Sequence, residues 1–117
     1  TRKESSAASD VYKRQLLRRA TDADGNPLEI HTVSPPLHPR RSKFLDGNDD
    51  FAAGYINYFV INGAVIAPEF GDPAADTKAR DLLARLYPGH KVVQIDIDAI
   101  ASGGGGIHCV TNQLPSA

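Results

Sequence analysis

The stretch YINYFVINGAVIAPEFGDPAAD, residues 55–76, decides the fold of this 117-residue chain. Its first part, Tyr55–Ile61, consists mainly of β-branched and aromatic residues, which are typical of a strand. Asn62-Gly63 follows, and this pair favours a tight hairpin because both residues tolerate positive φ. Ala64–Ala67 is then predicted as the return strand. The opening half of this stretch therefore predicts a β-hairpin.

The second half of the stretch predicts a helix that leads to a further strand. Asp72 can cap the helix and Pro73 suits its first position. Pro88-Gly89 is expected to end it, and Val92–Ile97 reads as the next strand. An apolar face is formed at helical spacing by Ala75, Ala79, Leu82, Leu83 and Leu86. The order strand, hairpin, strand, helix, strand describes one ββαβ unit.

The residues on either side extend this α/β unit. Downstream, Asp98–Ala101 is expected to form a short turn of helix or loop, and Ile107–Thr111 a final strand. Upstream, Leu16–Ala20 resembles the end of a helix, a turn follows at residues 22–27, and Leu28–Val33 alternates like a short strand. Residues 34–50, with three prolines, predict a long loop of the kind that often borders a functional site. The expected fold is one complete ββαβ module preceded by part of another.

The first fifteen residues, TRKESSAASDVYKRQ, are polar and show no clear period. They resemble translated adapter sequence, so residues 1–15 are interpreted as a non-native or disordered leader and residues 16–117 as the protein domain. An ordinary disordered or helical N-terminus is the alternative. Methionine is absent throughout, which indicates either its removal or a chain that is not a whole gene product.

Composition excludes several functional classes. The formal net charge is −1, so no electrostatic argument favours nucleic acid or an anionic membrane as a partner. The basic residues Arg40, Arg41 and Lys43 are interpreted as solvated loop residues. No apolar run approaches the ~20 residues of a membrane-spanning helix. A single cysteine rules out a disulfide within the chain and fits a reducing cytoplasm.

The glycine run at residues 103–106, followed by Ile107, His108 and Cys109, carries the chemistry. A dinucleotide or phosphate loop would require a following helix, which the strand-like residues after the run do not predict. A metal site is also disfavoured, because neighbours in a strand point to opposite faces and no metal-ligand spacing occurs. We therefore expect neither a cofactor nor a metal.

Two interpretations of Cys109 remain open from the residues alone. Glycines allow the backbone to approach a ligand closely, so a thiol after such a run suits a nucleophile. A lone cysteine can equally be a buried structural residue.

The segment GGGGIHCVTNQ resembles the C-terminal nucleophile motif of the agmatine deiminase family, GGGxxHCxTQQ. The stretch at residues 55–76 resembles the penultimate block of that family, and LYPGHKVVQIDIDAI resembles the segment between them. Asn112 and Leu114 stand where glutamines are usual in this family, which could alter the wall beside the nucleophile. The resemblance implies the pentein fold, an α/β propeller of five ββαβ-like modules, of which this chain would be the C-terminal part.

The resemblance also implies a mechanism. Cys109 would attack the guanidinium carbon of agmatine, with Gly104, Gly105 and Gly106 shaping the substrate site through backbone groups. The general acid–base histidine and the carboxylates that hold the guanidinium would lie in the missing N-terminal modules, so the fragment is expected to be inactive alone. His108 is expected to pack or hydrogen-bond, since a strand would turn it away from the Cys109 side chain.

Other polar residues receive structural interpretations. Asn57 and Asn62 are explained by strand pairing and the turn. Turn, cap or surface positions are expected for the carboxylates Asp46, Asp72, Asp96 and Asp98. A peptidyl-arginine deiminase of the same family, and a non-catalytic α/β module with a structural cysteine, remain alternative functions.

Overall fold

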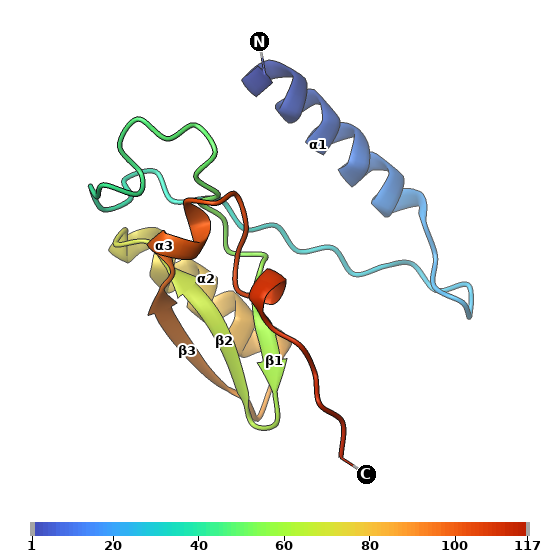
Figure 1. Cartoon of the computed structure of the whole chain (residues 1–117). Coiled ribbons are helices and arrows are strands. Elements are labelled where there is room, and N and C mark those ends of the chain that lie inside the picture. Colours follow the sequence, from blue (N-terminus) through green and yellow to red (C-terminus); the bar gives the residue numbers. More distant parts are fainter. Residues whose placement is uncertain (1, 117) are drawn as a thin grey trace. The chain divides into compact units, whose positions relative to one another are not determined.

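The computed structural model describes residues 2–116, with side chains from Val11 onward. The chain divides after Thr32 into two units, each described here by itself. The first contains helix α1 (Arg2–Arg19) and a turn closed by a single bridge between Thr21 and Pro27 (Figure 1). The predicted helix end at Leu16–Ala20 is thus confirmed up to Arg19. Whether residues 1–15 are native stays a prediction.

The predicted strand Leu28–Val33 is wrong. These residues have no regular secondary structure, and the only pairing nearby within the described chain is the isolated Thr21–Pro27 bridge. Alternation of polar and apolar residues stabilises a strand only where a neighbouring strand accepts its backbone hydrogen bonds. The strand expected for the partial module before the ββαβ unit is therefore absent from residues 28–33.

The second unit is a three-stranded mixed sheet with one helix packed against it. Strand β1 (Phe59–Ile61) pairs antiparallel with β2 (Ala64–Glu69), which pairs parallel with β3 (Lys91–Asp96). Helix α2 (Pro73–Leu86) connects β2 to β3 and packs on these two strands (Figure 1). The predicted ββαβ order is confirmed.

The turns and the helix cap that the sequence predicted are present in this unit. Gly63 has φ 79° in the hairpin turn, a conformation that L-residues with side chains rarely adopt. The Asp72 carboxylate accepts a hydrogen bond from the Ala75 amide, with Pro73 as the first helical residue. Gly89 has φ 80° just after the helix, where the predicted stop occurs.

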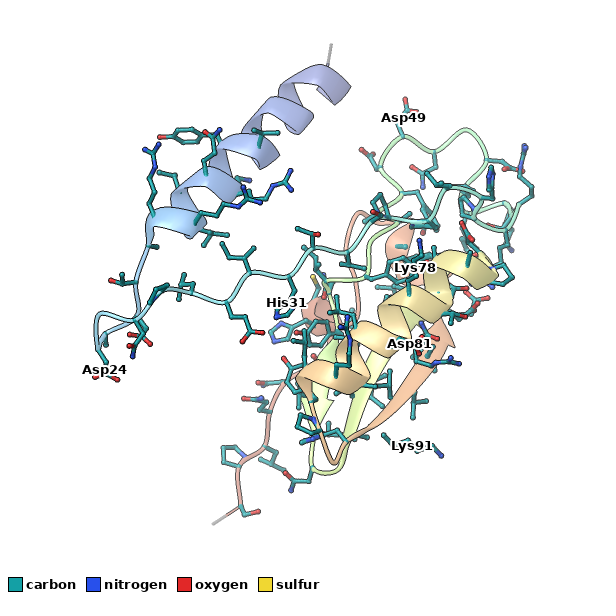
Figure 2. The ribbon with its side chains drawn as sticks, turned by 180° about the vertical axis from the view of Figure 1, so that it is seen from behind. Asp24, His31, Asp49, Lys78, Asp81 and Lys91 are labelled. Carbon is teal, nitrogen blue, oxygen red and sulfur yellow. The ribbon has the colours of Figure 1, made fainter. Side chains whose placement is uncertain are left out.

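The predicted apolar face of α2 is confirmed in part. Ala79 and Leu83 are buried, whereas Leu86 is 37% exposed. Lys78 and Asp81 lie on the opposite, outward side of the helix (Figure 2). The helix also buries Asp76, a carboxylate that the periodicity did not predict to be internal.

The core consists of two clusters on the sheet. One joins Val65, Ala67 and Leu83 between β2 and α2. The other surrounds Phe70, which contacts the rings of Phe51 and Tyr55 edge-on, with centroid separations of 6.2 and 5.4 Å. The second cluster lies beneath the segments that approach Cys109, because Tyr55 and Ile107 both belong to it.

Two further strand predictions need correction. The strand predicted for Tyr55–Ile61 begins only at Phe59, because Tyr55 turns into the core and Asn57 turns toward the glycine run. The final strand predicted for Ile107–Thr111 is instead a turn of 3₁₀-helix, His108–Val110. It follows α3 (Asp98–Ala101) and the glycine run. Local hydrogen bonds from Val110 to Ile107 and from Thr111 to His108 satisfy backbone groups that a strand would have paired elsewhere.

Candidate functional site

Cys109 is exposed and lies beside Asn57, a residue 52 positions earlier in the chain. The Asn57 Nδ2 group donates to the Cys109 sulfur at 3.3 Å. The Asn57 Oδ1 atom accepts from the backbone amide of His108 at 2.7 Å. One side chain therefore holds both the thiol and the backbone of the segment that presents it.

The environment of Cys109 favours the thiolate. The pKa of the thiol is lowered, first by the hydrogen bond from Asn57 and next by a backbone hydrogen bond from Gly106, while partial desolvation opposes the shift. Donors aimed at a sulfur stabilise its charged form, and the thiolate is the reactive nucleophile. A structural cysteine packed among aliphatic side chains would show neither this exposure nor these donors.

The glycine run permits this arrangement at two positions. Gly104 has φ 89°, a left-handed conformation that favours glycine. A Cβ atom on Gly106 would lie 2.6 Å from Asn57 Cγ, so only glycine allows Asn57 to approach this closely. Gly105 is different, because a Cβ there would meet the Cys109 sulfur at an ordinary 3.5 Å.

An open groove of about 510 Å³ adjoins the thiol. Residues 56–60 form one side of it, and His108, Cys109 and Gln113 complete the lining. Aromatic and aliphatic groups dominate the groove, and no carboxylate is among its lining residues. The groove can receive a small ligand next to the sulfur, but its described lining has no anion to bind a cation.

His108 lines the same groove as Cys109. The argument that a strand turns the two side chains apart is wrong, because the segment is a 3₁₀ turn. The His108 ring packs edge-on against Phe59, with 6.0 Å between ring centroids.

The carboxylates divide into two kinds. The Asp72 cap and the Asp96 turn, in which Asp96 accepts from the Asp98 amide, are confirmed, and Asp46 pairs with Arg41 at the surface. Asp98, in contrast, is buried and paired with Arg40 at 2.9 Å. It is wrong to describe Asp98 as a surface group.

Arg40 has a structural role that the sequence analysis did not predict. Its guanidinium donates to the Glu69 carboxylate at 2.7 Å and to Asp98 at 2.9 Å, and Asp96 lies 3.5 Å away. The carboxyl ends of parallel strands β2 and β3 bring these acids together, and the hydrogen bond to Glu69, followed by that to Asp98, raises the pKa of Arg40. The interpretation of Arg40 as a solvated loop residue is therefore wrong. The ion cluster instead fastens the long loop to the sheet.

Asn57 is the site residue that sequence reasoning missed. Strand pairing seemed to explain it, yet its side chain makes the polar contacts to Cys109 and His108. One signal was available, since a glycine run that ends in Gly106 predicts that another group packs closely against it.

Among the side chains that the structure describes, from Val11 to Ser116, no cluster of three or more His, Cys, Asp or Glu is arranged to hold a metal ion. In the same part of the chain, no helix is long and apolar enough to cross a membrane.

The fold of this chain matches segments of solved deiminase structures. The solved structure of the agmatine deiminase of Enterococcus faecalis matches 93% of this chain with a TM-score of 0.73 and 30% sequence identity. The model of the Porphyromonas-type peptidyl-arginine deiminase family matches residues 1–115, and the chain belongs to this family.

Curated relatives agree with this assignment. The agmatine deiminase of Stutzerimonas stutzeri is 38% identical over 114 residues, which cover 86% of this chain and 31% of the relative. That of Pseudomonas putida is 37% identical over 123 residues, covering 94% and 32%. The chain also spans 32% of the Enterococcus faecalis protein. The chain therefore spans about a third of the length of these relatives, each of which is named an agmatine deiminase.

Proposed function

We propose that Cys109 is the nucleophile of a deiminase that hydrolyses the guanidinium group of agmatine. The thiolate adds to the guanidinium carbon, a proton moves to one nitrogen, and ammonia leaves as the C–N bond breaks. Water then adds to the resulting amidino-cysteine, the C–S bond breaks, and N-carbamoylputrescine and free Cys109 are released. The step is covalent catalysis by an activated thiol.

The observation that carries the proposal is the convergence of Asn57 and Gly106 on an exposed sulfur that faces a groove. Reactive cysteines lie in partly exposed sites where donors or positive charge stabilise the thiolate. A bound guanidinium would add its own positive charge beside the sulfur. Gly104, Gly105 and Gly106 shape the approach to the sulfur through the backbone.

Agmatine is favoured as the substrate because the curated relatives are named agmatine deiminases. A peptidyl-arginine substrate is the second candidate, because the description of the matching family names that activity. The two substrates differ at the end remote from the guanidinium. The proposed setting is a cytoplasmic enzyme of putrescine and polyamine biosynthesis, in which this chain forms the last ββαβ module of a pentein propeller.

We infer that the chain alone does not turn over agmatine. The groove has no carboxylate among its lining residues, and three acids of the same unit are already engaged: Glu69 and Asp98 bind Arg40, while Asp76 accepts backbone and tyrosine donors. The groups that grip the guanidinium and transfer protons would come from the missing N-terminal modules.

A chimera tests the proposed reaction. Residues 33–117 replace the matching segment of the Stutzerimonas stutzeri agmatine deiminase, and ammonia and N-carbamoylputrescine are measured with agmatine as substrate. We expect turnover, its loss in a Cys109→Ser variant, and a Cys109 adduct with 2-chloroacetamidine by mass spectrometry. A folded chimera whose turnover survives Cys109→Ser would disprove the nucleophile assignment.

The isolated chain provides the complementary assay. With agmatine, the chain and its Cys109→Ala variant should release the same background of ammonia. Turnover by the unmodified chain above that background would show that the fragment is active and that our inference of inactivity is wrong.

A further inference from the structure

The position of Asn57 needs an anchor outside the sheet, because β1 begins only at Phe59. Residues 51–58, which precede this strand, contain neither helix nor strand. Small displacements of this segment would lengthen the 3.3 Å contact from Asn57 to the Cys109 sulfur, and hydrogen bonds weaken steeply with distance. The group that fixes this segment therefore also controls the thiol contact.

Tyr55, two residues before Asn57, anchors the segment in the core. Its side chain is 3% exposed, and its hydroxyl donates to the Asp76 carboxylate at 2.7 Å. The ring packs edge-on against Phe70. Tyr55 thus enters the core beside the point at which Asn57 turns toward the glycine run.

Asp76 is a rigid acceptor for this hydroxyl. It is 9% exposed, lies in the first turn of α2, and also accepts the backbone amides of Phe70 at 2.9 Å and Gly71 at 3.1 Å. Burial raises the pKa of Tyr55, so its hydroxyl keeps its proton and remains a donor over the working pH range. Asp76 belongs to α2 and is held by amides of the loop that follows β2, so the position at which it accepts the tyrosine hydroxyl is fixed.

Ring packing alone does not explain this pair. A phenylalanine at position 55 would keep the edge-on contact with Phe70 without requiring a buried acceptor. Burying a carboxylate and a hydroxyl is costly unless they are bonded to each other, and such polar pairs specify one arrangement among several of similar packing.

We propose that Tyr55 is a positioning residue that acts through Asn57 on the Cys109 thiol, with Asp76 as its fixed anchor. This inference deepens the proposed function and rests on it only for the role of Cys109 as nucleophile. Tyr55 touches neither the sulfur nor the groove, and its effect on reactivity passes through the Asn57 contact.

The experiment measures the alkylation rate of Cys109 by iodoacetamide as a function of pH in the full 117-residue chain. Cys109 is the single cysteine, so the whole rate belongs to it. Tyr55→Phe removes only the hydroxyl and should move the titration midpoint upward. Asn57→Ala removes the donor itself and should move it further in the same direction. The double variant should match Asn57→Ala, because the tyrosine would have nothing left to position.

Tyr87→Phe is the matched control. It removes a tyrosine hydroxyl from the pair that Tyr58 and Tyr87 form at 2.8 Å, and it leaves the Tyr55 anchor intact. We expect its Cys109 midpoint to equal that of the unmodified chain. Should Tyr55→Phe fold less completely, the profile is repeated in sucrose, which favours the folded state.

Three outcomes would overturn the proposal: no midpoint shift in folded Tyr55→Phe, an equal shift in Tyr87→Phe, or an additional shift from Tyr55→Phe in the Asn57→Ala background. The assay contains no guanidinium substrate. An inactive chimera together with the expected midpoints would therefore count against the deiminase proposal alone, whereas an active chimera with unchanged midpoints would count against Tyr55 alone.

Discussion

The sheet–helix core and the rim, by which we mean Asn57 and residues 103–110 with Cys109, are stabilised by different forces. In the core, Val65, Ala67 and Leu83 are removed from water, and the hydrophobic effect favours any arrangement that buries them. At the rim, the sulfur stays exposed and the segment that carries it is fixed by directional bonds to Asn57. Apolar burial sets whether the unit folds, and polar contacts set where the thiol points.

This difference implies that stability and thiol reactivity can be changed separately. Substitutions in the core should lower the free energy of unfolding and leave the pKa of Cys109 in place. Substitutions at the rim should alter the thiol with a smaller cost in stability. Each variant below is therefore measured twice, by urea unfolding and by the pH dependence of Cys109 alkylation.

The largest effect on stability is expected from Leu83→Ala. Leu83 is 4% exposed between α2 and the sheet, and truncation of a buried leucine costs about 2–5 kcal/mol of unfolding free energy. The Cys109 titration midpoint should stay unchanged in the variant that remains folded. Leu114→Ala is the control, because Leu114 is 96% exposed and should cost almost nothing. A shifted Cys109 midpoint in folded Leu83→Ala would show that core and rim are coupled.

Arg40→Ala tests the ion cluster that fastens the long loop. The substitution leaves the buried Asp98 carboxylate without its guanidinium partner, and we expect a loss of about 2 kcal/mol after allowing for the 29% exposure of the Arg40 side chain. Arg41→Ala is the matched control. Its partner is Asp46 and its side chain is 84% exposed, so its loss should stay within about 0.5 kcal/mol. Equal losses from both variants would mean that the Arg40 pairs behave as ordinary surface pairs.

Gly106→Ala should disrupt the contact between Asn57 and Cys109, with a smaller loss of unfolding free energy than the two preceding substitutions. The added Cβ would overlap Asn57, which must then move away from the sulfur, at a cost of about 1–2 kcal/mol. The Cys109 midpoint should rise as its donor is displaced. Gly105→Ala, whose Cβ has ordinary contact distances, should leave Asn57 in place. The contrast fails if the two alanine variants titrate alike.

The ββαβ unit could be predicted because each of its elements carries a local signal. Asn62-Gly63 specifies the hairpin, Asp72-Pro73 starts α2, and the alternation of apolar residues needs only neighbours that are close in sequence. Local propensity and tertiary packing agree in these elements, which is why the order of strands and helix was confirmed.

The errors arose where contacts distant in sequence decide the local structure. The 3₁₀ turn at His108–Val110 has strand-like residues, but Asn57 binds its first amide and Ile107 anchors it in the core. Arg40 meets Glu69 and Asp98 only because β2 and β3 run parallel. Cys109 could be proposed from its motif, whereas Asn57, Tyr55 and Asp76 could not, since their roles exist only once the chain is folded.

The smallest expected effect is on stability at low pH, and it tests whether the helix cap at Asp72 contributes to it. The Asp72 carboxylate accepts the amides of His38, Leu37 and Ala75, and the bond from His38 contributes most to the lowering of its pKa. A carboxyl whose pKa is lower in the folded state stabilises the fold at a pH above its unfolded pKa of about 3.9, and this contribution is lost as the pH falls through the folded value. The unmodified chain should thus lose stability below about pH 4.

Asp72→Asn retains an oxygen acceptor for the cap but cannot titrate. Its unfolding free energy should fall less steeply with acid than that of the unmodified chain, while the Cys109 midpoint stays the same. Urea unfolding at several pH values between about 2.5 and 6 measures the two slopes. Identical slopes would mean that the amides of the long loop bind the neutral carboxyl as well as they bind the carboxylate.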